Sequence, residues 1–241
     1  MISLEGKVAL ITGASRGIGK AIATDLAKAG IRLALNSSTE KSIEETRREL
    51  VKLGAEILSC PGDLADSGTP EVLIDRVVGH FGGIDILINN AGVAIPKPIV
   101  ETSIEEWDLH MAVNARAPFL LSRGAIPYLK KSDAATIINI SSVVGYKGYI
   151  NQGAYTASKH ALMGITKVLA QEVHQDDIRV YTIAPGGVFT DMVSKMRPDL
   201  DTSELIKPKE ISDIIMFILT HRGNAMIDQI NVHRFSNTPW I

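Results

Sequence analysis

The chain of 241 residues lacks most features of secreted, metal-dependent or nucleic-acid-binding proteins. Its single cysteine, Cys60, excludes an internal disulfide framework and is typical of a reducing compartment. The six histidines are scattered without the spacing of metal ligands, so we predict no catalytic metal. Lys and Arg total 25 against 27 Asp and Glu, a net charge of −2, which argues against nucleic acid or an anionic membrane as a partner.

Long apolar runs are also missing. Residues 8–12 are too few for a signal-peptide core or a membrane span. The longest apolar stretch, residues 211–219, is interrupted by Ser212 and Asp213. We therefore predict a cytoplasmic protein that does not associate with membranes.

Short runs rich in Val, Ile and Leu alternate with longer helical patterns, which is typical of a parallel sheet covered by helices on both faces. With 45% hydrophobic residues and no repeat or linker, the chain is predicted to form one α/β domain over residues 1–241. The predicted strands are residues 8–12, 32–36, 56–60, 85–89, 136–140, 179–184 and 227–232. The predicted helices are residues 17–29, 42–53, 70–80, 104–129, 155–173 and 209–220, the fourth with a capping box of Ser103 and Glu106.

A glycine cluster, Thr-Gly-Ala-Ser-Arg-Gly-Ile-Gly at residues 12–19, lies between the first predicted strand and the first predicted helix. A diphosphate needs a close backbone and helix N–H groups directed at it, so side chains must be absent where it approaches. The spacing differs from the commoner G-x-G-x-x-G, and glycines also serve ordinary turns. Because of the strand before and the helix after, we favour a dinucleotide site that includes Gly13, Ser15, Arg16, Gly17, Ile18 and Gly19.

Tyr155 and Lys159 stand four residues apart in a predicted helix and hence on one face of it. A free phenol titrates near pH ~10, and an ammonium nearby favours the phenolate. Lowering that pKa to ~7 takes roughly 4 kcal/mol, more than one exposed lysine supplies. A lysine in a dry cleft beside a second positive group, such as an oxidised nicotinamide, could supply it. Each residue could instead have only a structural role.

The chain also carries Asn-Asn-Ala-Gly at residues 89–92, Asn114, Ser142 and Pro-Gly at residues 185–186. In the order and spacing of these motifs, over about residues 3–190, it resembles the short-chain dehydrogenase/reductase family. The resemblance implies a single-domain, doubly wound, Rossmann-like parallel sheet of about seven strands that binds NAD or NADP.

The resemblance also implies catalytic roles. Tyr155 would protonate a carbonyl oxygen during reduction, and Lys159 would lower the pKa of Tyr155 and bind the nicotinamide ribose. Ser142 would bind the substrate oxygen, with its neighbour Ser141 the weaker candidate. Asn114 would interrupt its helix and hold a water that relays protons to Lys159.

Further cofactor contacts are implied in the same way. Asp63 would meet the adenine, Thr190 the nicotinamide amide, and the motif at residues 89–92 would close the fourth strand over the cofactor. Residues at the carboxyl ends of predicted strands fit this placement, since ligands of open α/β sheets bind there. The other predicted cofactor-binding residues are Leu64, Asn90, Ala91, Gly92, Tyr155, Lys159, Pro185, Gly186 and Val188.

The end of the second predicted strand bears on the choice between NAD and NADP. NAD specificity usually needs an acidic side chain about 20 residues beyond the glycines, to bind the ribose 2′-OH. Here Asn36, Ser37 and Ser38 offer no carboxylate. Arg16 could pair with a 2′-phosphate and the serines could add hydrogen bonds, although Arg16 could also be a surface charge. We predict NADP(H), with NAD less favoured.

Residues 191–205 are the predicted substrate lid. Its methionines make it partly apolar and adaptable, which suggests a medium-sized, fairly apolar ketone or alcohol as the small-molecule substrate. Ordinary loop packing would explain the same pattern. The residues concerned are Met192, Val193 and Met196 of the lid and, opposite them, Val143, Val144 and Tyr149.

Much of the chain is similar to 3-oxoacyl-carrier-protein reductases, which dock an acidic carrier through basic residues near two helix ends. The comparable segments here, residues 130–133 and 175–177, contain aspartates that disfavour an acidic partner. Residues 228–234 also depart from the usual Val-Asp-Gly-Gly-like turn. That reductase activity is the alternative function. A non-catalytic redox sensor that binds dinucleotide is the alternative of another class, disfavoured by the intact Ser, Tyr and Lys.

The predicted helix over residues 155–173 is apolar nearly all round, whereas a helix that covers a sheet should show water a polar stripe. The excess predicts a partner helix, and the resemblance implies dimers and tetramers. We predict a homotetramer, with a dimer as the fallback. The apolar residues are Ala157, Ala161, Leu162, Ile165, Val168 and Leu169.

Overall fold

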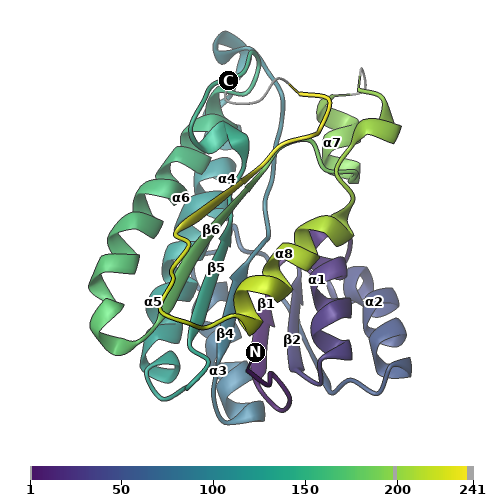
Figure 1. The fold of residues 1–241 in the computed structure, drawn as a ribbon. Coiled ribbons are helices and arrows are strands. Elements are labelled where there is room, and N and C mark those ends of the chain that lie inside the picture. Colours follow the sequence, from purple (N-terminus) through teal and green to yellow (C-terminus); the bar gives the residue numbers. More distant parts are fainter. Residues whose placement is uncertain (1, 198–199, 238–241) are drawn as a thin grey trace.

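The computed structural model describes residues 2–197 and 200–237. Residues 1 and 238–241 of the predicted domain and residues 198–199 of the predicted lid lie outside the described residues. Seven strands form one parallel sheet in the order β3-β2-β1-β4-β5-β6-β7 (Figure 1). They are β1 (Val8–Ile11), β2 (Arg32–Ser37), β3 (Ile57–Pro61), β4 (Ile86–Asn89), β5 (Thr136–Ile140), β6 (Arg179–Pro185) and β7 (Gln229–Val232). The predicted doubly wound parallel sheet is confirmed, with strand ends within two residues of those predicted.

The sheet is built outward from β1, which pairs with β2 on one side and β4 on the other. Successive residues of β1 face opposite sides of the sheet because side chains alternate along a strand. Ala9 and Ile11 join one hydrophobic cluster, and Val8 and Leu10 join the other. The reversal of strand order at β1 and β4 opens a crevice beyond the carboxyl ends of these strands, where ligands of such sheets bind.

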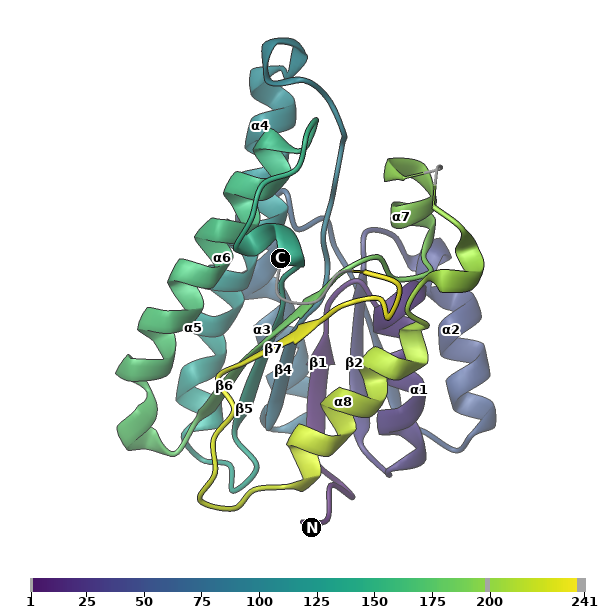
Figure 2. The same ribbon diagram turned by 45° about the horizontal axis from the view of Figure 1, so that its top comes forward.

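Helices cover both faces of the sheet (Figure 1). The first cluster packs α1, α2 and α8 against one face, and the second packs α3, α5 and α6 against the other. The helices are α1 (Gly17–Lys28), α2 (Glu40–Lys52), α3 (Thr69–Phe81), α4 (Ile104–Met111), α5 (Ala117–Leu129), α6 (Gly153–Glu172), α7 (Asp191–Met196) and α8 (Pro208–Thr220). Figures 1 and 2 both show α7, the helical part of the predicted lid, beyond the carboxyl ends of the strands.

The helix predicted over residues 104–129 is continuous in the chain but not uniform. A π-helical turn, Ala112–Arg116, joins α4 to α5, so the interruption expected at Asn114 is present. The predicted capping box begins α4: the Ser103 hydroxyl accepts from the Glu106 amide at 3.2 Å, and the Glu106 carboxylate accepts from the Ser103 amide at 3.0 Å. π turns often mark functional positions in helices.

Two further findings concern the described residues. None of their helices is long and apolar enough to cross a membrane. They also contain no group of three or more His, Cys, Asp or Glu side chains that could hold a metal ion.

Candidate active site

A cavity of about 730 Å³ lies at the carboxyl ends of the strands. This volume is in the range of small-molecule and cofactor sites, roughly 300–1,000 Å³. Of the predicted site residues, only Gly19 and Asn114 do not line it. Those on its wall are Gly13, Ser15, Arg16, Gly17, Ile18, Asn36, Ser37, Ser38, Asp63, Leu64, Asn90, Ala91, Gly92, Ser142, Tyr155, Lys159, Pro185, Gly186, Val188 and Thr190.

The glycines of the loop between β1 and α1 are required by geometry. Gly13 and Gly17 have φ of +63° and +55°, the left-handed region that side chains disfavour. Gly19 has a different role, since a Cβ there would lie 2.3 Å from the Gly13 carbonyl oxygen. Gly19 therefore allows the loop to fold back on α1, and Gly13 and Gly17 shape the wall of the cavity.

Thr12 and Asn90 fasten this loop to the end of β4. The Asn90 side-chain amide donates to the carbonyl oxygens of Thr12 at 2.8 Å and Gly13 at 3.0 Å. The Thr12 hydroxyl accepts from the backbone amides of Asn90 and Ala91, both at 3.0 Å. The predicted motif at residues 89–92 therefore holds the glycine loop in place as well as lining the cavity.

At the end of β2, two of the three predicted side chains form hydrogen bonds with the protein's own backbone. Asn36 is buried, and its side chain donates to the carbonyl oxygens of Cys60 at 3.0 Å and Gly62 at 3.1 Å. The buried Ser37 hydroxyl donates to the Thr39 carbonyl oxygen at 2.8 Å. Ser38 is exposed at the cavity wall. The expectation that Ser37 donates to a phosphate is therefore not supported, because that proton is already engaged.

The third strand ends at a turn that Asp63 stabilises. The exposed Asp63 carboxylate accepts from the Ala65 amide at 2.9 Å, and the buried Leu64 follows it on the cavity wall. Asp63 thus combines a turn-forming contact with a position at the mouth of the cavity.

Tyr155, Lys159 and Ser142 lie buried together on the wall, with exposed fractions of 8%, 3% and 9%. The Lys159 Nζ donates to the Ile140 carbonyl oxygen at 2.9 Å and lies 5.9 Å from the centre of the Tyr155 ring. Burial lowers the pKa of Lys159 to about 8. The lysine is therefore still largely a cation at neutral pH.

The expected lowering of the Tyr155 pKa by Lys159 is not found. Burial raises the pKa of Tyr155, and a hydrogen bond with the Ser142 side chain acts in the opposite direction. Spacing along a helix brings two groups together without showing how far burial disfavours the phenolate, so a lowered pKa of Tyr155 stays a prediction for the site with its coenzyme. The protonated phenol is the favoured form.

Asn114 lies behind the wall and is fully buried. Its side-chain oxygen accepts from the Val93 amide at 2.9 Å. Its side-chain nitrogen donates to the Val93 carbonyl oxygen at 2.9 Å and to the Ser158 hydroxyl at 3.0 Å. A Cβ on Gly92 would lie 3.3 Å from the Asn114 side-chain oxygen and 3.7 Å from the Lys159 Nζ, so a side chain here would crowd the Asn114 oxygen.

His110 is a buried residue near the site that the sequence analysis missed. Its Nε2 accepts from the Ile95 amide at 3.1 Å, which leaves Nδ1 to donate to the Glu106 carbonyl oxygen at 2.6 Å. Its ring centre lies 6.3 Å from that of Tyr155. The only signal in the sequence was a histidine among apolar helix positions, which usually indicates ordinary packing.

A small apolar cluster adjoins the cavity at Tyr155. Val143, Val144 and Tyr155 form a small cluster against which Ala94, Tyr149 and Met196 pack. The segment after β5 and the predicted lid thus meet as the sequence suggested. At the end of β6, the Gly186 amide donates to the Val232 carbonyl oxygen of β7 at 2.8 Å, which anchors the loop that leads to the lid.

A doubly wound parallel sheet with a glycine loop after its first strand and a cavity beyond its carboxyl ends defines a Rossmann-like protein. The family model of short chain dehydrogenases matches residues 7–201. The chain belongs to this family, and the predictions of that family and of an oxidoreductase enzyme are confirmed.

Among its relatives, the chain is 38% identical to a 2-dehydro-3-deoxy-D-gluconate 5-dehydrogenase of Dickeya dadantii, over 88% of this chain and 82% of that protein. It is 32% identical to a 3-oxoacyl-[acyl-carrier-protein] reductase of Thermotoga maritima, over 94% of this chain and 96% of that protein. A metagenomic short-chain oxidoreductase solved in complex with NADP is 33% identical and superposes with a TM-score of 0.84, covering 98% of this chain and all of that one.

Proposed function

We propose that the protein is an NADP(H)-dependent oxidoreductase that interconverts a ketone and a secondary alcohol by hydride transfer. The observation that carries the proposal is the burial of Tyr155, Ser142 and Lys159 on one wall of a cavity whose other part is lined by the glycine loop. A proton donor is thus within the same cavity as a site suited to a dinucleotide. Metal-free carbonyl reduction needs such a donor.

The residues present fit NADP. Left-handed Gly13 and Gly17 bring the backbone against the cavity, as a diphosphate requires. Arg16 and Ser38 are exposed on the wall, and residues 36–38 at the end of β2 carry no carboxylate that would repel a 2′-phosphate. The NADP complex of a related oxidoreductase supports this choice. When bound, the coenzyme's nicotinamide ring supplies or accepts the hydride.

During reduction, the Tyr155 hydroxyl donates its proton to the carbonyl oxygen. Burial suits this role because it keeps the phenol protonated. Ser142, hydrogen-bonded to Tyr155, orients the hydroxyl and binds the same substrate oxygen. The phenolate that forms is stabilised by the Lys159 cation, which lies 5.9 Å from the ring centre in a site of low exposure. Return of the proton through Lys159 and a water near Asn114 stays a prediction.

The substrate we propose is a medium-sized, fairly apolar ketone or alcohol. The cluster of Val143, Val144 and Tyr155 and the side chains packed on it carry no charge apart from what Tyr155 acquires in the reaction. Reduction of 3-oxoacyl chains on a carrier protein is the alternative, favoured by the relative of that activity. Asp176 argues against an acidic carrier, although it pairs with Lys130 at 2.9 Å.

We further propose a homotetramer, with a dimer as the fallback, in the cytoplasm. The free and buried Cys60 suits a reducing compartment. On α6, Val168 is exposed and Ala161 and Ile165 are half-buried, which supports self-association, whereas Leu162 and Leu169 belong to the core.

Replacing Tyr155 by Phe tests the mechanism. Loss of the proton donor is expected to lower kcat/KM for ketone reduction with NADPH by roughly 10²- to 10⁴-fold. The Kd for NADPH should stay close to that of the wild type, since the ring and its packing remain. Steady-state kinetics on a panel of activated ketones and fluorescence titration of NADPH measure the two quantities.

Tyr146→Phe is the matched control, because Tyr146 is 36% exposed and does not line the cavity. Its activity should match that of the wild type. Near wild-type turnover by Tyr155→Phe would sink the assigned mechanism. A wild-type protein that binds NADPH and reduces no ketone would instead favour the redox sensor.

A further inference from the structure

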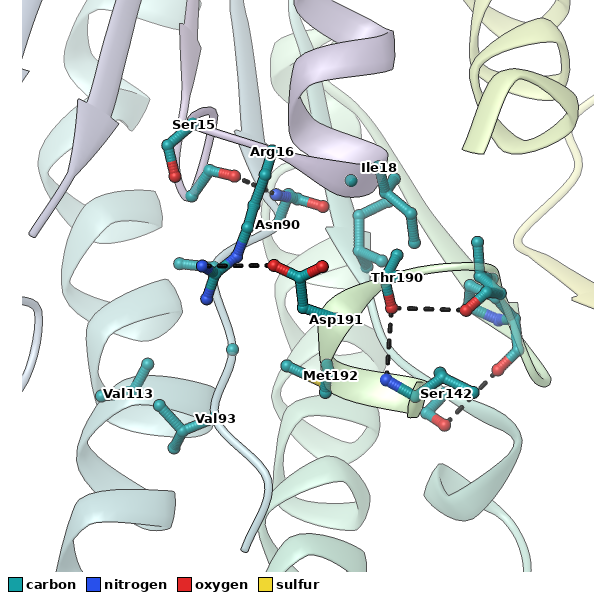
Figure 3. A pocket seen from close by; sticks show the side chains of 18 of the residues that line it. Ser15, Arg16, Ile18, Asn90, Val93, Val113, Ser142, Thr190, Asp191 and Met192 are labelled. Carbon is teal, nitrogen blue, oxygen red and sulfur yellow. Dashed lines mark hydrogen bonds and ion pairs between the residues drawn. The ribbon is translucent and has the colours of Figure 1, made fainter. Parts of the chain in front are cut away.

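An ion pair joins the glycine loop to the start of the lid. The Arg16 Nη1 lies 3.5 Å from the Asp191 Oδ2, and both residues line the cavity (Figure 3). Arg16 immediately precedes α1, and Asp191 is the first residue of α7. The two side chains therefore meet from different walls of the same cavity.

A second contact fixes where Asp191 lies. A Cβ on Gly17 would be 3.0 Å from the Thr190 Cγ2, so the glycine loop and the start of α7 approach closely at the neighbouring pair of residues. The Thr190 hydroxyl accepts from the Val193 amide at 3.4 Å, which caps α7 and sets the direction of the backbone at Asp191. Thr190 therefore places the first residue of α7 beside the glycine loop, next to Arg16.

The charges along the wall make this pair relevant to the coenzyme. The ionisable Asp, Glu, Lys and Arg side chains that line the cavity are Arg16, Asp63, Lys159 and Asp191. Lys159 is buried, so in the described part of the chain Arg16 is the exposed cation of the wall. A 2′-phosphate that pairs with Arg16 must share it with Asp191 or displace it.

We propose that Asp191 sets the discrimination between NADPH and NADH by competing with the 2′-phosphate for Arg16. The inference rests on the proposed function, which assigns Arg16 to that phosphate. Asp191 repels the diphosphate common to both coenzymes equally, so the competition acts on the ratio of the two affinities. Removing the carboxylate therefore increases the preference for NADPH.

The expected change in the ratio of the two coenzyme affinities is small because both charged side chains are exposed to water. The side chains of Arg16 and Asp191 are 73% and 64% exposed. Exposed pairs are weak because water and salt screen them, so releasing Arg16 corresponds to a change of roughly two- to fivefold. Asp191 thus tunes the selectivity that Arg16 creates.

The experiment is a double-mutant cycle on coenzyme binding. The Kd values of NADPH and NADH are measured by fluorescence titration for the wild type, Asp191→Asn, Arg16→Gln and the double variant. The ratio of Kd for NADH to Kd for NADPH is expected to rise roughly two- to fivefold in Asp191→Asn. In the Arg16→Gln background the same substitution should leave the ratio unchanged.

Asp201→Asn is the matched control. It removes one charge from the same lid segment, and its carboxylate contacts Ser203, accepting from that amide at 2.8 Å, with no contact to Arg16. Its ratio should equal that of the wild type. The NADH titration also shows whether each variant keeps a working dinucleotide site.

The outcomes separate the two proposals. An unchanged ratio of the two Kd values in Asp191→Asn, or an equally tighter binding of both coenzymes, overturns the role of Asp191. If the wild type still prefers NADPH, the coenzyme assignment stands. A rise of equal size in the Arg16→Gln background also overturns the role of Asp191. Tighter binding of NADH than NADPH by the wild type removes both the coenzyme assignment and this inference.

Discussion

Lys159 is a charged side chain that the fold keeps almost entirely from water, with 3% of it exposed. Burial lowers its pKa from 10.5 to about 8. Between these two values the unfolded chain binds the proton and the folded chain does not, so the free energy of unfolding rises with pH. Below pH 8 both states are protonated and the full penalty of the buried charge applies. A shift of this size corresponds to roughly 3 kcal/mol.

Lys159→Met is therefore expected to stabilise the protein at pH 7 while it abolishes turnover. The free energy of unfolding should rise by about 1–3 kcal/mol. Removing the buried charge is favourable, but loss of the hydrogen bond to the Ile140 carbonyl oxygen offsets part of that benefit. The advantage over the wild type should shrink as pH rises from 8 towards 10.5, because the wild-type lysine then becomes neutral. Urea unfolding at pH 7, 8.5 and 10 measures it.

Lys167→Met, an exposed position of the same helix, controls for general effects of removing a lysine. It should show no such dependence on pH. A stability difference for Lys159→Met that stays constant across this range would contradict the assigned cause.

For single residues, the sequence predicted which side chains lie close together better than it predicted their protonation states. The spacing of Tyr155 and Lys159 placed both on one helix face, and the structure finds them there. Burial, which raises the Tyr155 pKa, depends on how the surrounding elements pack. The pair of Arg16 and Asp191 joins segments far apart in the chain, so no local pattern could indicate it.

Among the elements, the α4–α5 helix shows how a local irregularity positions the site. Its π turn at Ala112–Arg116 carries Asn114, whose side chain binds both backbone groups of Val93. The segment after β4 is thereby held against the helix beside Lys159. The apolar pattern of the sequence runs through this turn, so periodicity predicted one helix, and only the family resemblance indicated an interruption.

Replacing Asn114 by Ala is expected to lower the free energy of unfolding by about 1–3 kcal/mol, because the half-buried backbone groups of Val93 and the buried Ser158 hydroxyl lose their partner. The kcat should fall as the segment shifts, with a smaller change in the Kd of NADPH. Asn114→Asp should not rescue either quantity, since a carboxylate accepts from the Val93 amide but cannot donate to its carbonyl oxygen. Denaturation curves and steady-state kinetics measure both.

Asn231→Ala, at an exposed position of β7, serves as the control and should change stability by less than about 0.5 kcal/mol. If Asn114→Asp restored the kcat of the wild type, the two donated hydrogen bonds would have no role in positioning the segment.

For the whole molecule, the alternation of buried runs and helices was enough to predict the sheet, because parallel strands covered on both faces leave a strong apolar signal. The order of the strands was not predicted, since local patterns carry no information on which strands pair, and only the doubly wound arrangement came from the resemblance. The sheet does not determine the oligomeric state, which depends on the helix surfaces. Along α6, Val168 is 56% exposed, and Phe119 of the neighbouring α5 is 46% exposed.

A groove between α4, α5 and α6 has Phe119, Ala161 and Ile165 on its wall, together with the charged Glu105, Asp108 and Arg116. Ala161, Ile165 and Val168 recur at helical spacing on one face of α6. A charge placed there opposes burial against a second copy. Val168→Glu is therefore expected to reduce the tetramer to a smaller species.

Light scattering at micromolar concentration measures the mass of each variant, and Lys167→Glu, one position away, should keep that of the wild type. A monomeric wild-type protein would refute both the tetramer and the dimer.

The position of β7 has a consequence for how the protein is made. The Gly186 amide binds the Val232 carbonyl oxygen and so anchors the loop that leads to the lid. Among the seven strands of the described residues, β7 comes last in the chain. A truncated chain that stops before Gln229 would contain every residue of the cavity wall and still lack the support of its final loop. Translation must therefore pass β7 before this loop has its support, so a chain terminated earlier is expected to carry every residue of the wall without a fixed position for the lid.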